Sequence, residues 1–220
     1  MTRVRTAASP SYKVINMKDI NNLIHRATEM KSNGMHLGQI ADELNLSRET
    51  VTWILAHSSE KKELRVPKDL SIDWSSIGES SYRLRCISDA MVDMILDDVG
   101  DPANIDVVIG VAVSGIPLAS IVANELAAKL AIFHPNKQLL GIETTDAKGI
   151  FSQNFADVEE STCAIVDDVI TTGRTLTETV RQLTDMGAKP VAIAVIVDKI
   201  GQSTIEGVPV YSLMRTVWVT

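Results

Sequence analysis

The sequence predicts an α/β protein, a doubly wound parallel sheet preceded by a small all-α unit. From residue 82 onward, apolar runs rich in Val and Ile alternate with helical stretches, which is typical of parallel strands joined by right-handed crossover helices. Before residue 66, apolar residues instead recur every three or four positions, the period of helices with one buried face. A chain of 220 residues is long enough for two such domains of unequal size.

Three short helices are expected in an N-terminal unit over residues 17–65, which follows a flexible arm at residues 1–16. Ser47 is a good N-cap residue for the last of these helices. Residues 66–81 are polar and contain Pro67, so we expect a linker and an irregular lead-in there. The expected helices cover residues 19–30, 37–44 and 47–57.

The larger domain is expected over residues 82–220, where strands and helices alternate. Its apolar runs are continuous rather than alternating, as in strands that are covered on both faces. The expected strands are residues 105–113, 163–166, 191–197 and 208–213, with weaker ones at 130–133 and 139–142. The expected helices are residues 85–97, 117–129 and 173–186.

Composition limits the class of protein. Hydrophobic residues make up 45 % and charged residues 22 % of the chain, an ordinary globular balance. No stretch is apolar enough for a membrane span, and the first residues lack the apolar core of a signal peptide, so we expect a cytoplasmic protein with no membrane partner. Cys86 and Cys163 are far apart and outside any metal motif, so we expect two small buried apolar side chains.

The formal net charge of −7 is unevenly distributed. Residues 1–65 carry ten basic and seven acidic side chains, whereas the remainder carries 11 basic and 21 acidic ones. Such a division suggests two domains with different partners. The acidic total therefore does not exclude a nucleic acid as one of those partners.

Two carboxylates and a Thr/Gly turn follow the apolar run at residues 163–166. Ligands of open α/β sheets gather at the carboxyl ends of the strands. A glycine allows a tight turn there, and the N–H groups at the start of the next helix favour an anion such as a phosphate monoester. The carboxylates are suited to sugar hydroxyls or to a divalent cation shared with phosphate oxygens. The residues concerned are Asp167, Asp168, Thr171, Thr172, Gly173, Arg174 and Thr175.

The segment CAIVDDVITTGRTL resembles the phosphoribosyl-diphosphate signature of the type I phosphoribosyltransferases. That resemblance implies that Asp167 and Asp168 contact the ribose hydroxyls and that residues 171–175 hold the 5′-phosphate. It also implies Mg²⁺ bound together with the ligand, with Asp167 and Asp168 as candidate metal ligands. The alternative is a capped helix after a buried strand, which leaves two adjacent carboxylates without a partner.

A second loop in this family holds the diphosphate through backbone N–H groups. Val113, Ser114 and Gly115, within GVAVSGIPLA, occupy the matching position and resemble the orotate phosphoribosyltransferase version. The same residues are also ordinary strand-to-helix turn chemistry, with Pro117 near the start of a helix. Both interpretations stay open from the sequence alone.

The resemblance weakens in the loop that catalyses transfer. Active orotate transferases carry a basic loop that closes over the diphosphate and stabilises its departing charge. The corresponding residues 141–154 contain one lysine, Lys148, beside Glu143 and Asp146. Lys148 is therefore either a remnant of the catalytic loop or a solvated surface lysine.

Residues 37–55 resemble a DNA-binding helix-turn-helix. Ala41 is the small residue of the first helix, and apolar side chains stand at the expected offsets from it. The exposed face of the second helix would read base edges and phosphates. The candidates are Ser47, Arg48, Glu49, Thr52 and Trp53. The alternative is a helical hairpin used for dimerisation or as a cap, and Trp53 is equally suited to cover the neighbouring domain.

Together the two halves resemble the archaeal orotate-phosphoribosyltransferase-like transcriptional regulators of the GfcR type. That resemblance implies a homodimer that binds double-stranded DNA and controls sugar-catabolic genes. It also implies an effector domain that senses phosphoribosyl diphosphate, or a related phosphorylated metabolite, with Mg²⁺. Two alternatives stay open: an active orotate-like phosphoribosyltransferase with an accessory helical domain, and an RNA-binding attenuation regulator.

Overall fold

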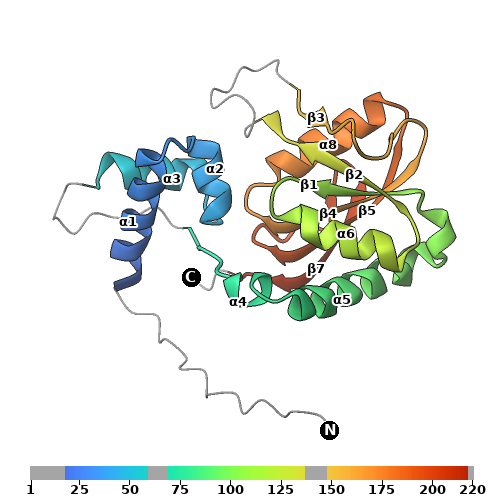
Figure 1. Cartoon of the computed structure of the whole chain (residues 1–220), viewed down its shortest axis with the longest axis horizontal. Coiled ribbons are helices and arrows are strands. Elements are labelled where there is room, and N and C mark those ends of the chain that lie inside the picture. The colour runs from blue at the N-terminus through green and yellow to red at the C-terminus, as the bar shows by residue number, and fades with distance from the viewer. Residues whose placement is uncertain (1–17, 59–68, 137–147, 218–220) are drawn as a thin grey trace, which may run out of the picture.

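The computed structural model describes residues 18–58, 69–136 and 148–217 (Figure 1). The flexible arm expected at residues 1–16 and the weak strand expected at residues 139–142 lie outside these ranges. No helix of the described residues combines the length and the hydropathy that a membrane crossing requires.

The N-terminal unit contains the three expected helices. Buried apolar side chains from all three, including Ala27, Ile40 and Val51, form its separate core. Asn45, between the second and third helices, has φ 51°, a left-handed conformation that Asn tolerates at a tight turn. The helices are α1 (Lys18–Ser32), α2 (Leu37–Glu43) and α3 (Arg48–Ala56).

The lead-in to the larger domain is more helical than the sequence predicts. A short helix, α4 (Ser75–Gly78), lies in the segment expected to be irregular. The next helix, α5 (Ser81–Val99), begins four residues before the expected position 85. It begins there because Ser80 is its N-cap: the hydroxyl oxygen accepts a hydrogen bond from the Arg83 backbone N–H at 3.4 Å.

In the larger domain, the described residues form a seven-stranded sheet in the order β3-β2-β1-β4-β5-β7-β6. The central strands pair in parallel, whereas β3 and β6 pair antiparallel to β2 and β7. The strands are β1 (Val107–Val111), β2 (Lys129–His134), β3 (Ile150–Phe151), β4 (Thr162–Ile170), β5 (Lys189–Asp198), β6 (Thr204–Ile205) and β7 (Val208–Arg215). The short 3-10 helix η1 (Pro102–Asn104) precedes β1, and the described helices between the strands are α6 (Gly115–Glu125) and α8 (Arg174–Asp185).

Helices cover both faces of this sheet, which confirms the doubly wound fold (Figure 1). One core lies between the sheet and helices α5 and α6, with Met91, Ile95 and Leu118 fully buried. The other lies on the α8 side, where Leu176 and Leu183 pack against the strands. Because these helices cover the faces of the sheet, the carboxyl ends of the central strands lie together at one edge, outside both layers of helices.

Three expectations are corrected. Strand β4 does not end before Asp167 but continues to Ile170, because its ladder with the long strand β5 pairs Asp167 with Val195 and Ile170 with Asp198. Strand β1 ends at Val111 instead of residue 113. The two short antiparallel strands were not expected as additions to the parallel sheet.

The expectation for the two cysteines is half right. Cys163 is buried in β4, and burial, followed by the nearby negative charge of Asp106, raises the pKa of its thiol to about 12. Cys86 is exposed on α5 instead of buried, because it lies on the face of that helix opposite Met91 and Ile95.

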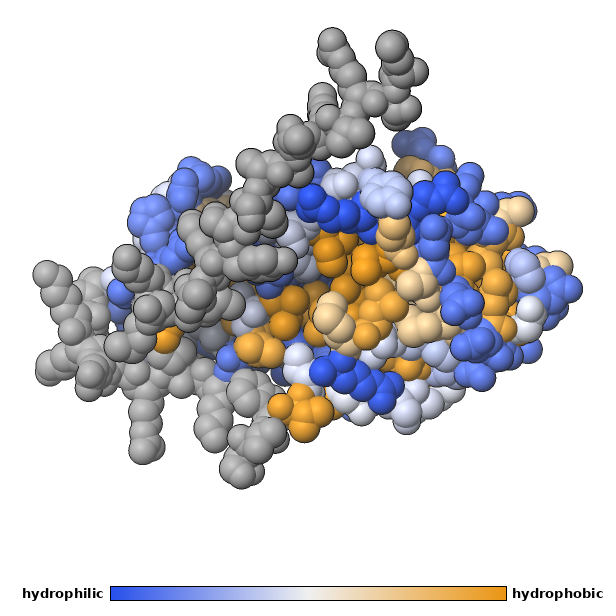
Figure 2. All heavy atoms as spheres, turned by 90° about the horizontal axis from the view of Figure 1, so that it is seen from below, coloured by the Kyte–Doolittle hydropathy of each residue, from blue (hydrophilic) through white to orange (hydrophobic). Residues whose placement is uncertain are grey.

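Apolar side chains also gather on the side of the molecule where α4 and α5 lie (Figure 2). Helix α5 lies on this side (Figure 1), and half-buried hydrophobic residues of α5 and β7, among them Ile87, Met94 and Leu213, pack against the core next to it. Met214 at the end of β7 is 50 % exposed. A contiguous apolar surface of this kind is typical of a protein contact.

Candidate functional site

The turn after β4 has the geometry of an anion-binding turn. Gly173 has φ 75°, a left-handed conformation that lets the chain reverse directly into α8, whose N-cap it is. The first backbone N–H groups of a helix have no carbonyl partner within it, and the helix dipole makes this end positive. Thr171 and Thr175, on either side of Gly173, add hydroxyl groups. The turn is therefore suited to a phosphate group.

The loop after β1 lies directly against β4. A Cβ atom on Gly115 would lie 2.6 Å from the backbone oxygen of Val166 and 3.1 Å from the Cα of Asp167. Only glycine permits this approach. It brings Val113 and Ser114, at the end of β1, to the side of the two aspartates. The Ala112–Val113 peptide bond is cis.

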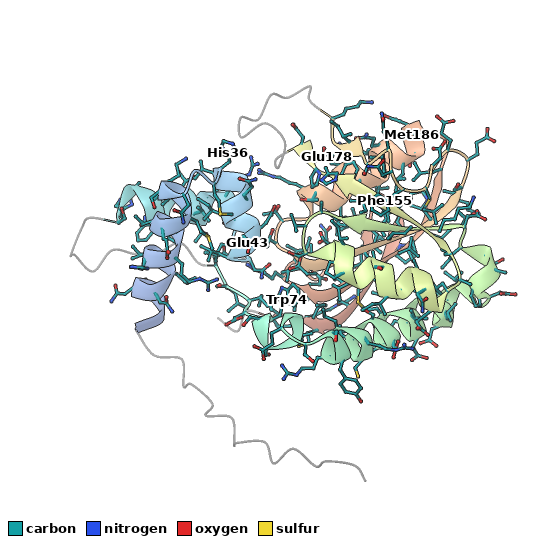
Figure 3. All side chains as sticks on the ribbon, in the orientation of Figure 1. His36, Glu43, Trp74, Phe155, Glu178 and Met186 are labelled. Atoms are coloured by element: carbon teal, nitrogen blue, oxygen red, sulfur yellow. The ribbon has the colours of Figure 1, made fainter. Side chains whose placement is uncertain are left out.

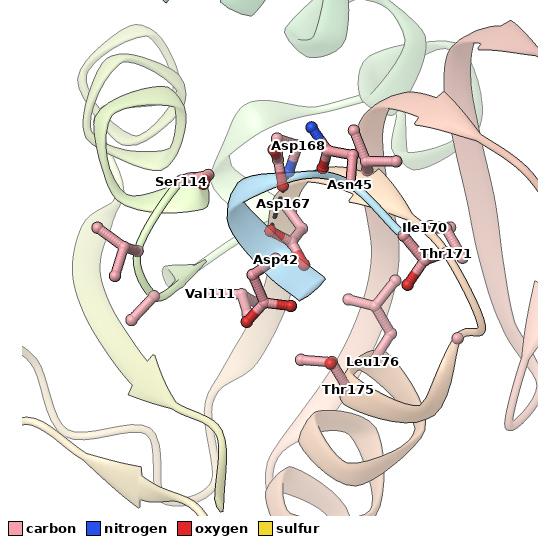
Figure 4. Close-up of a pocket in the computed structure, with 14 residues that line it drawn as sticks. Asp42, Asn45, Val111, Ser114, Asp167, Asp168, Ile170, Thr171, Thr175 and Leu176 are labelled. Atoms are coloured by element: carbon pink, nitrogen blue, oxygen red, sulfur yellow. Dashed lines mark hydrogen bonds between the residues drawn. The ribbon is translucent and has the colours of Figure 1, made fainter. Parts of the chain in front are cut away.

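These loops line one cavity of about 40 Å³ (Figure 4). A second cavity of about 100 Å³ adjoins it, and Thr172 and Arg174 contribute to that one. Gly115 lines neither cavity but holds its loop in place. The sequence-predicted residues in the first cavity are Val113, Ser114, Asp167, Asp168, Thr171, Gly173 and Thr175.

The two aspartates differ. Asp168 is 8 % exposed, and its Oδ2 atom accepts a hydrogen bond from the indole Nε1–H of Trp74 at 2.8 Å. Burial raises the pKa of Asp168, the negative charge of Asp42 raises it further, and the bond from Trp74 acts in the opposite direction. Asp167 is half-buried, and its Oδ1 atom accepts from the backbone N–H of Asp168 at 2.9 Å. A ligand hydroxyl therefore meets a half-buried carboxylate at Asp167 and a more deeply buried one, bonded to Trp74, at Asp168.

Three further residues at the site were not predicted from the sequence. Asp42 on α2 and Asn45 in the following turn line the same cavity as the aspartates (Figure 4). Trp74 lies between the N-terminal helices and α5 (Figure 3) and lines a third cavity of about 350 Å³, together with Asp42, Asn45 and Asp168. No local sequence pattern marks these three residues as part of a site. They reach the aspartates only through the tertiary fold, which brings the N-terminal helices and the lead-in against the sheet.

A buried ion pair attaches the N-terminal unit to the sheet. Lys199, directly after β5, lies 2.6 Å from Oδ1 of Asp69, and the two side chains are only 6 % and 11 % exposed. The Lys199 ammonium also donates to the backbone carbonyl of Asn45 at 3.0 Å. Lys199 follows an apolar run at the carboxyl end of a strand, so the rule that found the aspartates could have found it.

Asp69 also caps α3. Its Oδ2 atom accepts from the Ser47 backbone N–H and from the Thr50 hydroxyl, both at 2.8 Å. Burial by itself raises the pKa of Asp69. The hydrogen bond from Lys199 and those from Ser47, Thr50 and Leu70 outweigh burial and lower the pKa to about 2. We call this assembly of Asp69, Lys199 and Asn45 the clamp.

Lys148 is not brought to the site. Its ammonium lies 3.1 Å from Asp185 Oδ2 at the far end of α8, and the lysine side chain is 70 % exposed. Lys148 is not among the described residues that line the cavity at the aspartates. Most of the loop that precedes it, residues 141–147, lies outside the described residues.

The candidate DNA-contacting residues share the N-terminal half of α3. Ser47 is the N-cap, since its Oγ atom accepts from the Thr50 backbone N–H at 3.2 Å. Glu49 and Thr52 are exposed, and the Glu49 carboxylate lies 3.7 Å from the guanidinium of Arg174. Trp53 is half-buried and stacks on His57, with ring centroids 4.7 Å apart. Arg48 is half-buried beside them.

The site fits Mg²⁺ only as part of a complex with a ligand. The described residues contain no group of three or more His, Cys, Asp or Glu side chains that could hold a metal ion. Mg²⁺ characteristically takes one or two carboxylates together with phosphate oxygens and water. Asp167 and Asp168, beside an anion-binding turn, provide carboxylates of that kind.

The chain is similar to proteins of known sequence and structure. The model of the phosphoribosyl transferase domain matches residues 73–206. A transcriptional regulator GfcR of Methanococcoides burtonii is 50 % identical over 200 residues, which cover 90 % of this chain and 98 % of the relative. Transcriptional regulator GfcR 1 of Methanosarcina barkeri is 52 % identical over 202 residues, 91 % of this chain and 98 % of the relative.

Among solved structures, the orotate phosphoribosyltransferase from Aeropyrum pernix superposes with a TM-score of 0.51 at 22 % identity. The superposition covers 69 % of this chain and 83 % of that one. At this identity the likeness concerns the fold, whereas the relatives above match nearly the whole length of both chains. The chain therefore belongs to the GfcR family of transcriptional regulators, and residues 73–206 form its phosphoribosyl transferase domain.

Proposed function

We propose that this chain is a DNA-binding regulator whose sheet domain senses phosphoribosyl diphosphate or a related phosphorylated metabolite. The observation that carries the proposal is the convergence of a phosphate-binding turn, two aspartates and the loop after β1 on one cavity. The catalytic candidate Lys148 is paired with Asp185 instead. The site thus retains groups that bind, and no Lys or Arg of the described residues lines the cavity at the aspartates, where a cation would stabilise the departing charge.

Each part of the ligand has a matching part of the site. The 5′-phosphate would bind the N–H groups and hydroxyls of residues 171–175. The ribose hydroxyls would donate to Asp167 and Asp168. The diphosphate would lie at residues 113–115, with Mg²⁺ shared between its oxygens and a carboxylate. An acidic domain needs such backbone donors and a metal, since it has few cations of its own.

Double-stranded DNA is the proposed partner of the N-terminal unit, through a helix-turn-helix made of α2 and α3. Arg48 would bind guanine or phosphate, while Glu49 and Thr52 would meet base edges and phosphates. Ser47 caps α3, so its hydroxyl would contribute by fixing the start of the recognition helix. The GfcR naming of the relatives, and the basic excess before residue 66, support DNA as the partner. Genes of sugar catabolism are the proposed targets.

A homodimer is the proposed assembly. Two-fold symmetric dimers place two recognition helices at half-sites about one helical turn apart. The apolar face over α5 and β7 (Figure 2) supports a second copy of this chain as its partner. Sedimentation equilibrium should give twice the monomer mass, and a monomer at all micromolar concentrations would contradict this assembly.

An active orotate-like transferase is the second candidate, and the preserved phosphate turn and aspartates favour it. An assay of base-dependent diphosphate release distinguishes the two functions. The sensor predicts no turnover, whereas rates in the usual enzymatic range of about 1–1,000 s⁻¹ would establish the transferase. Competition between duplex DNA and RNA tests an RNA-binding regulator in the same way, since the sensor should prefer the duplex DNA.

The ligand proposal is tested by calorimetric titration of the full chain with phosphoribosyl diphosphate and Mg²⁺. The double substitution Asp167→Asn and Asp168→Asn removes two charged acceptors and should weaken binding by about 100-fold or more. Asp93→Asn, which removes a charge from the exposed face of α5, is the matched control and should bind as wild type does. Equal binding by the double variant would place the ligand elsewhere.

A further inference from the structure

Asp42 stands at the junction of three cavities. It lines the cavity at the aspartates, the adjoining cavity beside Thr172 and Arg174, and the third cavity beside Trp74. Figure 4 shows its carboxylate in the space between Asp167 and Thr175, carried there by α2. A residue of the N-terminal unit therefore divides the space in which a phosphoribosyl ligand would lie.

The two cavities at the phosphate turn are too small for that ligand. The cavity at the aspartates measures about 40 Å³, which holds about three water molecules. Pockets that enclose a small organic ligand measure about 300–1,000 Å³. The third cavity, at about 350 Å³, lies within that range, but none of residues 171–175 lines it, and Asp42 on α2 stands where it meets the two smaller cavities at the phosphate turn.

The negative charge of Asp42 opposes entry of the ligand, as the small cavity volume does. Asp42 adds a third carboxylate beside Asp167 and Asp168, within reach of the turn that would bind phosphate. A polyanionic ligand entering this space would meet Asp42 at short range in partly buried surroundings, where like charges repel strongly. Asp42 thus faces the phosphate turn with the same sign of charge as a phosphate group.

Contacts of the α2–α3 turn with the rest of the chain hold α2 in this position. The clamp joins the α2–α3 turn to the end of β5 through Lys199, and Lys199 lines none of the three cavities. The Asn45 side chain donates to the Ile72 carbonyl at 2.9 Å. Because the Lys199 side chain lies outside these cavities, the clamp can be broken there without altering a residue that would bind the ligand.

We propose that α2 and the α2–α3 turn compete within the molecule for the phosphoribosyl cavity, so that ligand entry and the docked position of the N-terminal helices exclude each other. The inference rests on the proposed ligand and adds how binding is transmitted to the DNA-binding helices. Only molecules in which α2 has left the cavity can bind the ligand. The measured affinity is therefore the affinity of these undocked molecules multiplied by the fraction of the protein that they represent. Binding of the ligand draws the molecule into the undocked state and frees α3 from the sheet domain.

The test compares the affinity of four full-length proteins for phosphoribosyl diphosphate with Mg²⁺ by calorimetry. Lys199→Met breaks the clamp and should tighten binding about tenfold, because the docked competitor is weakened. Simple electrostatics predicts the opposite sign, since this variant loses a positive charge and its ligand is an anion. Asp42→Asn should also tighten binding, whereas the control Asp93→Asn should leave it unchanged.

Hydrogen exchange on the wild-type chain gives a reading that needs no substitution. Saturating ligand should speed exchange of the α2 and α3 amides and slow exchange at residues 171–175. Tighter binding by Lys199→Met together with faster exchange in α2 supports the competition. If the wild type binds the ligand while Lys199→Met binds equally or more weakly and α2 exchanges no faster, the competition is wrong and the proposed ligand stands. If none of the four proteins binds the ligand, both fail.

Discussion

The turn after β4 and the turn between α2 and α3 meet at one cavity, yet they come to it in different ways. The first is local: Asp167, Thr171 and Gly173 are neighbours in sequence, and the strand-to-helix reversal places them together. The second is brought there by contacts across the chain, such as the bond from Lys199 to Asn45, 154 residues away. A local motif thus indicates what a site binds, and distant contacts determine what else occupies it.

The clamp is expected to give the largest effect. Lys199→Met leaves Asp69 buried without its cation, and removal of one partner of a buried pair costs about 3–5 kcal/mol. The loss should fall on the docking of the N-terminal helices, with the sheet little affected. Amide exchange resolved along the chain measures this. Equal destabilisation of α3 and of strands β4 and β5 would show that the two regions are not separable.

The local turn is tested by Gly115→Ala. The new Cβ atom would lie 2.6 Å from the Val166 backbone oxygen, so the loop after β1 must move away from Asp167. Overpacking of this kind costs about 1–3 kcal/mol in the free energy of unfolding, and the displaced loop should weaken phosphoribosyl diphosphate binding about tenfold. Denaturant unfolding and calorimetry measure the two effects. Unchanged affinity in a folded variant would remove this loop from the ligand site.

The proposed DNA-binding face is tested by Arg48→Ala. Loss of a base or phosphate contact should weaken DNA binding by about 1–3 kcal/mol, and loss of a phosphate contact should flatten its salt dependence by about one unit of slope. Arg48 also lines the adjoining cavity beside Thr172 and Arg174, so phosphoribosyl diphosphate binding is measured on the same variant to separate an effect on the ligand from an effect on DNA. Titration at several salt concentrations measures the change. DNA affinity equal to that of wild type would remove Arg48 from the interface.

The smallest expected effect is the pH dependence of the stability that Asp69 contributes. The pKa of Asp69 falls from an ordinary 3.8 to about 2 in the folded chain, so its ionised form stabilises docking above pH 4. This contribution, about 1 kcal/mol after allowance for solvent screening, is lost as pH falls from about 4 toward 2. The stability difference between wild type and Asp69→Asn should therefore shrink over that range. A difference independent of pH would mean that Asp69 is not ionised in the clamp.

The sequence predicts the sheet, its helices and the phosphate turn, because each depends on residues close together in the chain. It also predicts the three N-terminal helices from their apolar period. It does not predict that Trp74 bonds to Asp168, 94 residues away, since a side chain in an apparently irregular lead-in carries no sign of its partner. The position of Asp42 is hidden for the same reason: helix periodicity identifies a buried face but not the surface that the remaining face covers.

The central claim is that a phosphoribosyl ligand in the sheet domain sets the affinity of the N-terminal helices for DNA. It is tested most directly by titrating a promoter fragment selected by the wild-type protein, with and without phosphoribosyl diphosphate and Mg²⁺. The account predicts that the ligand shifts the wild-type midpoint by about 5- to 150-fold and leaves the Asp167→Asn, Asp168→Asn double variant unmoved. The same wild-type midpoint with and without saturating ligand would contradict it.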